Sequence, residues 1–295
     1  MTFQAIAVTG GTGLLGSHVM RRLHVRAALT AVDIKPPHES DRTLGTFVEA
    51  SITDYDAMRA AFAGKDAVIH LAAIPNPREA AAGVTFNTNV QGAWTVLQAA
   101  EDAGVRRVVV ASSDSVFGFS FNPRDWPPQF LPVDETHPVR PTEFYSLSKK
   151  VTEAIAESYA ARKTLEVLAI RPSHIVFPRG YPEIGKRGAD VQNYHFWSWV
   201  APEDVAQAFD LALNMKAYRG YDVFTIAAAE GMNTRPTLEM AQERWSDMPA
   251  VRRPEIYRDN PTAGVLDITK AREKLGYEPK VDRAALLAKA GASDA

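Results

Sequence analysis

The feature that most constrains the fold is the run TGGTGLLG at residues 9–16, which lies between an apolar segment and a helical one. Residues 3–9 (FQAIAVT) are expected to form a strand, and residues 14–24 a helix. Gly10, Gly13 and Gly16 allow a tight turn, a close approach of backbone to a pyrophosphate, and close helix–strand packing. The start of the helix offers free N–H groups to phosphate. A strand, a glycine turn and a helix in this order predict a dinucleotide-binding site.

Short β-like segments alternate with helical segments along most of the chain. Further strands are expected at 27–33, 46–49, 68–73, 106–113, 165–172 and 222–228, and helices at 54–63, 83–103, from 142, from 202 to about 216, and after Pro236 and Thr269. Near-continuous apolar strands that alternate with helices are typical of a parallel sheet covered on both faces. We therefore predict an α/β fold, a Rossmann-type doubly wound parallel sheet with a small interleaved C-terminal substrate-binding region.

The same pattern gives an expected division of the chain. Residues 1–172, to which 202–228 returns, are expected to form the dinucleotide-binding domain. Residues 173–201 and 229–295 are expected to form the small substrate-binding region. A chain of 295 residues with 46% apolar residues is long enough to bury a core of this kind.

Charge and composition exclude several classes of function. The 33 Lys and Arg against 35 Asp and Glu give a net charge of −2, so no basic excess argues for nucleic acid or an anionic membrane. The chain has no cysteine, which excludes disulfides, thiolate catalysis and Cys-ligated zinc. The seven His lack the spacing of a metal site, so no metal is predicted. Without a signal peptide or a membrane-spanning stretch, we expect a soluble, cytoplasmic protein.

Asp33, at the end of the second expected strand, is a candidate for selecting the cofactor. A carboxylate at this place can accept hydrogen bonds from both ribose hydroxyls of the adenosine half, and it would repel a 2′-phosphate. This favours NAD over NADP. Lys35 and Arg42 lie nearby in the sequence and leave NADP as the less favoured alternative.

The pattern Tyr-x-x-x-Lys occurs twice in one expected helix, as Tyr145 with Lys149 and as Tyr159 with Lys163. Ligands of open α/β sheets lie beyond the carboxyl ends of the strands, so a helix that follows a strand starts near the ligand. Tyr145 begins this helix, and Tyr159 lies roughly 21 Å further along it. Tyr159 is therefore interpreted as a packing residue, and Lys163 as a cation that suits the end of a helix.

Tyr145 also has polar neighbours in the expected sheet. The strand RRVVVASS delivers Ser112 and Ser113 to the same carboxyl edge. A phenol with an ordinary pKa of about 10 is a poor base at neutral pH, but a nearby Lys ammonium and a cationic nicotinamide favour the phenolate. Tyr145 could then accept a proton from a substrate hydroxyl while Ser holds the substrate oxygen.

At this point the sequence resembles the extended short-chain dehydrogenase/reductase family, in its NAD-dependent epimerase/dehydratase group. The resemblance spans nearly the whole chain and rests on TGGTGLLG at 9–16, HLAA at 70–73, NTNVQGAWTVLQAA at 87–100, ASSDSVFG at 111–118, YSLSK at 145–149, RP at 171–172 and KAREKLGYEP at 270–279. It implies that Ser113, Tyr145 and Lys149 are catalytic. It implies cofactor contacts from Gly10, Gly13, Leu14, Leu15, Gly16, Asp33, Ser51, Ile52, Leu71, Ala72, Ala73, Asn89, Ser112, Tyr145, Lys149, Ser173 and His174.

The sequence departs from this family at the positions that would hold a nucleotide sugar. The segment after Arg171 is short, and Trp197 stands where many members carry an Arg that pairs with the diphosphate. Ser51 replaces an Asp that contacts adenine in many members. In these respects the chain is more similar to uronate dehydrogenases and related dehydrogenases of free sugars. The candidate substrate contacts are Asn76, Ser113, Asp114, Tyr145, His174, Arg179 and Trp197, with Arg187 as an alternative clamp for a carboxylate.

Three functions follow as alternatives. The leading one is an NAD-dependent dehydrogenase that oxidises a hydroxyl of a small sugar, sugar acid or polyol with Ser113, Tyr145 and Lys149. The second is a sugar epimerase or dehydratase with tightly bound NAD. The third is a dinucleotide-binding regulator without catalysis, against which the retained Tyr145 and Lys149 argue. The resemblance also implies a homodimer packed through the helices near 83–103 and 142–163.

Overall fold

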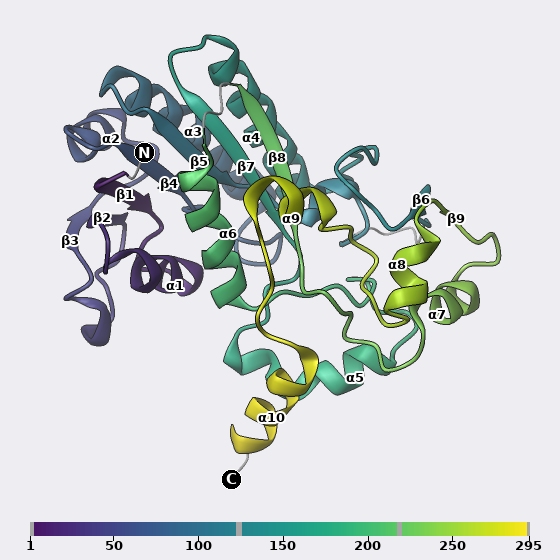
Figure 1. Cartoon of the computed structure of the whole chain (residues 1–295). Helices are drawn as coiled ribbons and strands as arrows, with labels where there is room; N and C mark the ends of the chain where they lie inside the picture. The colour runs from purple at the N-terminus through teal and green to yellow at the C-terminus, as the bar shows by residue number, and fades with distance from the viewer. Residues whose placement is uncertain (1–2, 122–125, 217–219, 294–295) are drawn as a thin grey trace. The chain divides into compact units, whose positions relative to one another are not determined.

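The computed structural model describes residues 3–121, 126–216 and 220–293 (Figure 1). In these residues the main sheet has seven strands, in the order β3-β2-β1-β4-β5-β7-β8. Their bounds are β1 Ala5–Thr9, β2 Ala28–Asp33, β3 Thr46–Glu49, β4 Ala67–His70, β5 Arg107–Ala111, β7 Glu166–Pro172 and β8 Tyr221–Ile226. The pairings from β3 through to β7 are all parallel. The predicted doubly wound parallel sheet is therefore confirmed.

The strand order reverses around β1, which has β2 on one side and β4 on the other. Thr9, the last residue of β1, is paired in register with Val32 of β2 and His70 of β4. Ligands of doubly wound sheets bind outside the carboxyl ends of the strands at such a switch point. The glycine turn, which follows β1 directly, therefore lies where a dinucleotide would be held.

Helices cover both faces of this sheet, as Figure 1 shows, with α2, α3 and α4 on one face and α1 and α6 on the other. The helices of the whole described chain are α1 Leu14–Leu23, α2 Tyr55–Phe62, α3 Ala82–Asp102, α4 Phe144–Ala161, α5 Ile184–Ala189, α6 Pro202–Asn214, α7 Thr237–Arg244, α8 Pro254–Asp259, α9 Thr269–Leu275 and α10 Arg283–Ser293. The carboxylate of Asp54 caps α2 by accepting from the Ala57 N–H at 3.0 Å, and that of Glu143 caps α4. Gly276 ends α9 with a φ of 71°, a conformation that glycine adopts without strain.

The core between the sheet and helices α2, α3 and α4 is apolar and tightly closed. It is formed by Ala7, Val32, Ile52, Met58, Ala61, Phe62, Val68, Val96, Leu97, Ala99, Ala100, Val105, Val108, Val110, Ala156, Tyr159, Ala160, Leu165, Val167 and Ala169. Within a strand every second residue enters this core, as Val108 and Val110 of β5 do, because successive side chains of a strand point to opposite faces of the sheet. Burial of this surface is the main force that fixes α4 against the sheet.

The chain divides into two compact units. The first consists of Met1–Ser113, Pro141–Ile170 and Ala206–Val223, and it contains the glycine turn and the start of α4. The second consists of Asp114–Arg140, Arg171–Val205 and Phe224–Ala295, and it contains His174 and Trp197. The segment 114–140 thus belongs to the second unit, although the sequence placed it within residues 1–172. The division into a cofactor domain and a substrate domain stays a proposal.

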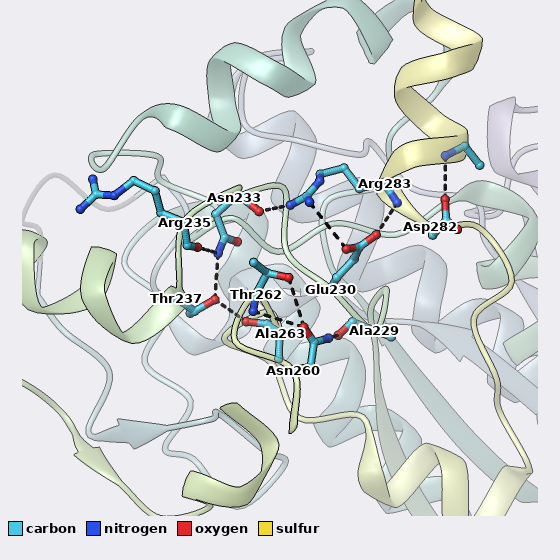
Figure 2. A network of polar contacts seen from close by, with 11 residues as sticks. Ala229, Glu230, Asn233, Arg235, Thr237, Asn260, Thr262, Ala263, Asp282 and Arg283 are labelled. Atoms are coloured by element: carbon cyan, nitrogen blue, oxygen red, sulfur yellow. Dashed lines mark hydrogen bonds and ion pairs between the residues drawn. The ribbon is translucent and has the colours of Figure 1, made fainter. Parts of the chain in front are cut away.

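In the second unit a network of polar contacts joins three segments that are far apart in the sequence (Figure 2). The carboxylate of Glu230 accepts a hydrogen bond from the Arg283 N–H at 2.6 Å. The amide of Asn233 donates to the carbonyl of Arg235 at 2.8 Å and to the hydroxyl of Thr237 at 2.9 Å. The amide of Asn260 donates to the carbonyl of Ala229 at 3.2 Å. These contacts fix the start of α10 to the loop that precedes α7.

Two features of the fold differ from the sequence expectation. The strand expected at 68–73 ends at His70, because the N–H groups of Leu71 and Ala72 both turn to the carbonyl of Thr9, at 3.0 and 3.1 Å. The sequence also did not predict α5, α8 and α10 or the two-stranded sheet of β6 (Phe130–Leu131) and β9 (Ala250–Val251). Except for α10, these elements are so short that they carry little periodic signal and form only where the tertiary structure supports them.

Candidate active site

The glycine turn after β1 leaves no room for side chains at two of its positions. Gly10 has a φ of 72°, and a Cβ on it would lie 2.7 Å from the backbone nitrogen of Ala72. A Cβ on Gly16 would lie 2.0 Å from the carbonyl oxygen of Gly10. Gly13 is the N-cap residue of α1 and makes no side-chain cap, so it leaves the first N–H groups of this helix, at Leu14 and Leu15, without a capping hydrogen bond from its own position. The turn therefore fits the pyrophosphate of a dinucleotide, which takes its hydrogen bonds from such N–H groups.

Asp33 ends β2 beside this turn. Its Oδ2 accepts from the Thr12 N–H at 3.3 Å and its Oδ1 from the Ile34 N–H at 2.8 Å. The hydroxyl of Thr12 donates in turn to the carbonyl of Lys35 at 2.9 Å. The carboxylate thus lies against the glycine turn, where the adenosine ribose of a dinucleotide would be expected.

Ser51 and Ile52, which follow β3, have local roles. The hydroxyl of Ser51 is hydrogen-bonded to that of Thr53 at 2.9 Å. Ile52 is buried against α3, where a Cβ on Gly92 would lie 2.2 Å from its Cδ1. Gly92 therefore allows the close contact between α3 and the segment that follows β3.

His70 ends β4 and lies at the same edge of the sheet. Its Nδ1 shares a hydrogen bond of 2.7 Å with the hydroxyl of Thr9. Burial, with a smaller contribution from the charge of Lys149, lowers the pKa of His70 to about 3. His70 is therefore neutral at physiological pH. The following residues, Leu71 to Ala73, leave the sheet and pass the glycine turn.

Asn89 of α3 connects the loop after β4 to helix α4. Its Oδ1 accepts from the Ile74 N–H at 2.8 Å, and its Nδ2 donates to the Ile74 carbonyl at 3.1 Å. The same Nδ2 donates to the hydroxyl of Ser148 at 3.0 Å. Asn76, by contrast, stabilises its own turn, since its Oδ1 accepts from the Arg78 N–H at 2.8 Å and its Nδ2 donates to Glu79 at 3.2 Å. The sequence had left a turn role open for Asn76.

Tyr145 and Lys149 lie in the first turns of α4, next to the end of β5. The Nζ of Lys149 donates to the carbonyl oxygen of Ala111 at 2.8 Å and lies 5.9 Å from the centre of the Tyr145 ring. Burial lowers the pKa of Lys149 to about 8, although the charge of Glu153 acts in the opposite direction. Ser112 and Ser113 follow Ala111 and are buried like Tyr145. The structure thus brings the end of β5 and the start of α4 together, as the sequence predicted.

The second Tyr/Lys pair has the packing role that the sequence predicted. Tyr159 is fully buried, its hydroxyl donates to Gln98 Oε1 at 2.8 Å, and the guanidinium of Arg162 lies 3.9 Å from its ring centre. Lys163 lies just beyond the end of α4, is exposed and has a φ of 65°. This pair is therefore structural.

In the second unit, His174 belongs to a small aromatic and charged cluster. The Nη1 of Arg187 lies 2.9 Å from the Nε2 of His174, and Arg187 is also paired with Glu183. The rings of His174 and His195 are stacked, with centroids 4.0 Å apart. Burial, and after it the charge of Arg187, lowers the pKa of His174 to about 4, so that neutral Nε2 can accept from the guanidinium. Arg187 rather than Arg179 is thus the Arg that contacts His174.

The other candidates in this unit are placed as follows. Trp197 is fully buried and its indole N–H donates to the carbonyl of Asp190 at 2.9 Å. A ring enclosed in this way packs the core, so the expected stacking of Trp197 on a sugar does not suit this structure. Arg179 is exposed. Ser173 is buried with its N–H bonded to the carbonyl of Ile226 at 2.8 Å, and Asp114 opens the short helix Asp114–Phe117.

Two residues near Lys149 were missed as site residues. Glu153 is buried, and its Oε1 accepts from the hydroxyl of Ser112 at 2.5 Å. Ser148 donates to the carbonyl of Tyr145 at 2.6 Å while it accepts from Asn89. The spacing Lys149 to Glu153, four residues along one helix face, was the signal that could have identified Glu153.

Neither a metal site nor a membrane span is found in the described parts of the chain. Among residues 3–121, 126–216 and 220–293, no group of three or more His, Asp or Glu side chains is arranged to hold a metal ion. Within the same residues, no helix is both long and apolar enough to cross a bilayer.

A doubly wound parallel sheet with a glycine turn at its switch point defines a dinucleotide-binding α/β protein. Residues 6–227 match the model of the NAD dependent epimerase/dehydratase family. The chain is 33% identical over 214 residues to the L-arabinose 1-dehydrogenase (NAD(P)(+)) of Haloferax volcanii, a match that covers 70% of this chain and 82% of that protein. The chain is therefore an enzyme of the NAD-dependent epimerase/dehydratase family, as the sequence predicted.

Other relatives have different activities. The chain is 28% identical over 219 residues to the uronate dehydrogenase of Pseudomonas putida, a match that covers 72% of each protein. It is 26% identical over 307 residues to the UDP-glucose 4-epimerase of Streptomyces lividans, covering 92% of this chain and 90% of that one. Among solved structures, a short-chain dehydrogenase/reductase superfamily protein from Agrobacterium tumefaciens with bound NAD has the same fold, with a TM-score of 0.73 at 24% identity over 98% of this chain and 96% of that one.

Proposed function

We propose that this chain is an NAD-dependent dehydrogenase that oxidises a hydroxyl of a small sugar, sugar acid or polyol. The observation that carries the proposal is the arrangement at the end of β5. There Lys149 donates to the carbonyl of Ala111 at 2.8 Å, and its ammonium lies 5.9 Å from the ring centre of Tyr145. Ser113 lies two residues after Ala111 in the chain, at the same strand end. A phenol, a cation and a hydroxyl together suit the removal of a proton from an alcohol.

The residues would divide this chemistry as follows. NAD, when bound, supplies the acceptor for the hydride that leaves the hydroxyl-bearing carbon. Tyr145, as phenolate, would take the hydroxyl proton as the carbonyl forms. The Lys149 ammonium would stabilise that phenolate because an opposite charge nearby favours the ionised form. Ser113 would hold the substrate oxygen by a hydrogen bond. Asn89 would fix the first turn of α4 through Ser148.

The proposed cofactor is NAD, bound by the glycine turn and by Asp33. The uncapped start of α1 supports binding of the pyrophosphate, and the carboxylate of Asp33 beside Thr12 supports the choice of NAD over NADP. The cofactor contacts of Ser51, Ile52, Leu71, Ala72, Ala73, Ser173 and His174 stay proposals that rest on the family resemblance.

The proposed substrate is small, and two findings support this. The segment between Arg171 and α6 is short, and the chain is similar to an L-arabinose 1-dehydrogenase and to a uronate dehydrogenase. His174 and Arg187 are the proposed substrate contacts in the second unit, since they are bonded to one another at 2.9 Å. Asp114 and the exposed Arg179 are kept as further candidates for substrate binding.

A nucleotide-sugar epimerase is the second candidate, favoured by the match to the Streptomyces lividans UDP-glucose 4-epimerase over 92% of this chain. An epimerase returns the hydride to its substrate and so releases no NADH. It would also retain its cofactor through purification. The release of NADH and the retention of the cofactor can both be measured on one preparation, and together they distinguish the dehydrogenase from the epimerase.

The test is a screen of the purified chain for NADH formation, by absorbance, with pentoses, hexoses, uronic acids and polyols. Tyr145→Phe is the test variant, and Tyr159→Phe is its matched control because it removes a phenol from the same helix away from the proposed site. We expect activity on at least one of these substrates, a loss on the order of a hundredfold or more in Tyr145→Phe, and retained activity in folded Tyr159→Phe. Full activity in Tyr145→Phe would contradict the proposed mechanism. Epimerisation of UDP-glucose without NADH release would establish the second candidate instead.

A further inference from the structure

Glu153 is a buried carboxylate for which the proposed function has no role. It lies one helical turn after Lys149 on α4, and the two residues are 8% and 6% exposed. Charged residues are seldom buried to this degree unless they are paired, because water solvates their charges far better than protein does. Both residues, however, have polar partners at the end of strand β5.

The two side chains reach consecutive residues of the same strand end. The Nζ of Lys149 donates to the carbonyl oxygen of Ala111 at 2.8 Å. The hydroxyl of Ser112 donates to the Oε1 of Glu153 at 2.5 Å. A cation and an anion on one face of α4 are thus each fixed to β5, and Ser112 holds the carboxylate in place.

His70 and Tyr145 also lie near Lys149 in the described part of the chain. His70, on β4, is kept neutral by its own burial, which lowers its pKa to about 3. Tyr145 lies on the same helix, with its ring centre 5.9 Å from Nζ, and α3 contributes the uncharged Asn89 through Ser148. Glu153 is the group whose negative charge raises the pKa of Lys149 against the effect of burial.

The order of the two residues argues that they serve the site rather than the helix. A Lys that precedes a Glu by four residues stabilises a helix less than the reverse order does. Replacing a buried ion pair by apolar residues is often neutral or favourable for stability. The two residues therefore add little to the stability of α4 itself, whereas the negative charge of Glu153 acts to raise the pKa of Lys149.

We propose that Glu153, held by Ser112, is a positioning residue whose carboxylate keeps the buried Lys149 ammonium charged and directed at the end of β5. In this way Glu153 sets the range of pH over which the charged Lys149 can stabilise the phenolate of Tyr145. The inference rests on the proposed function for its catalytic consequence, but the pairing of Glu153 with Lys149 can be tested without any substrate.

The first test is a double-mutant cycle with Glu153→Gln, Lys149→Met and the double variant, each unfolded by urea at about pH 7 and at about pH 10. Near pH 7 we expect Glu153→Gln to lower the urea midpoint of the wild-type chain and to maintain or raise that of Lys149→Met. This coupling should fade near pH 10, since the pKa of Lys149 is about 8 and its side chain is then neutral. An equal loss in both backgrounds near pH 7 would overturn the proposal.

A variant of this cycle that fails to fold still tests the proposal. If Glu153→Gln alone does not fold, recovery of folding in the double variant supports the pairing, because no unpaired charge is then buried. Failure of the double variant where Lys149→Met alone folds overturns it. Neither outcome depends on which sugar, if any, the chain oxidises.

The second test uses the pH profile of kcat/KM with the substrate found in the screen. In Glu153→Gln we expect the alkaline limb of the profile to shift to lower pH by about one unit, which is a tenfold change in a proton-binding constant. We expect the acidic limb to shift to higher pH. Glu153→Asp, which retains the charge but is too short for the bond to Ser112, should lower kcat with both limbs nearly in place. A uniform loss of activity at every pH in Glu153→Gln, with neither limb displaced, would indicate a merely structural role and overturn the proposal. Absence of any dehydrogenase activity would defeat the proposed function instead.

Discussion

The amide of Asn89 donates a hydrogen bond to the hydroxyl of Ser148 at 3.0 Å, and this bond joins α3 to the first turns of α4. Ser148 donates onward to the carbonyl of Tyr145 at 2.6 Å. Because Asn89 also pairs with both backbone groups of Ile74, the loop after β4 and the backbone of Tyr145 are fixed to the same side chain. The position of Tyr145 is therefore determined by the packing of two helices.

Stability should fall in acid because two histidines, the buried His70 and the half-buried His174, are held in the neutral form. The pKa of His70 is about 3 and that of His174 about 4, both below the ordinary value of 6.5. Below about pH 6.5 the unfolded chain therefore binds protons that the folded chain does not bind. The stability that comes from the neutral histidines is present above that pH and is lost as the pH falls. Each His should contribute a slope of up to about 1.4 kcal/mol per pH unit.

The measurement is the free energy of unfolding by urea between about pH 7 and about pH 4.5. His70→Asn should show a smaller decrease in acid than the wild-type chain, and His24→Asn, at an exposed position, should show the wild-type decrease. Identical pH dependence in His70→Asn and the wild-type chain would contradict the neutral, buried state of His70.

Asp33 should determine the preference for NAD over NADP. Asp33→Asn removes the charge that would repel a 2′-phosphate but retains an oxygen that can accept from the Thr12 N–H. We expect the ratio of NADP to NAD affinity to rise on the order of tenfold, which corresponds to about 1.4 kcal/mol.

Titration of both dinucleotides by calorimetry gives this ratio directly. Asp41→Asn is the matched control, because Asp41 pairs with Arg21 at 2.7 Å in the short helix Glu39–Asp41 that follows β2. If both substitutions change the ratio equally, Asp33 does not determine the preference for NAD over NADP.

The glycines of the turn should respond differently to alanine. In Gly16→Ala the new Cβ would meet the carbonyl oxygen of Gly10 at 2.0 Å, so the turn must move and both stability and NAD binding should be lost. In Gly13→Ala the nearest atom lies at 3.3 Å and φ is −73°, so the fold should be retained within about 0.5 kcal/mol.

Gly13→Ala should nevertheless bind NAD more weakly, because its methyl group stands where the pyrophosphate must approach the backbone. Urea unfolding and calorimetric titration with NAD, measured on both variants, separate packing from binding. Unchanged NAD affinity in Gly13→Ala would show that the pyrophosphate lies elsewhere.

Helices α3 and α4 should form the interface of a homodimer, as the family resemblance implies. They pack side by side and expose the apolar side chains of Val84 and Trp94 on α3 and of Leu147 on α4, with Trp94 47% exposed. Trp is often a residue that carries much of the binding energy of an interface, so Trp94→Glu should weaken dimerisation by about 2 kcal/mol or more.

Sedimentation velocity over a range of concentrations measures this effect. Val25→Glu is the control, since Val25 is 77% exposed but lies after α1, outside both helices. A wild-type chain that stays monomeric at all concentrations would refute the dimer, and a Trp94→Glu chain that dimerises normally would refute this interface.

Local patterns in the sequence predicted the sheet, the glycine turn and the choice between the two Tyr/Lys pairs. The turn is recognised because strand, glycines and helix follow one another within a few residues. Tyr145 and Tyr159 are distinguished by their positions along one helix, since a parallel strand order places the start of that helix near the ligand edge. The burial of Tyr159 and the bond from Lys149 to Ala111 agree with this prediction.

Only the tertiary structure decided which polar side chains became partners. Ser112 and Glu153 are 41 residues apart in the sequence, and their bond exists because α4 packs against the end of β5. Trp197 was expected to contact a sugar, but burial and a bond to the carbonyl of Asp190 make it a core residue. Periodicity is a local property and is visible in a sequence, whereas burial and hydrogen-bond pairing depend on segments that meet only after folding.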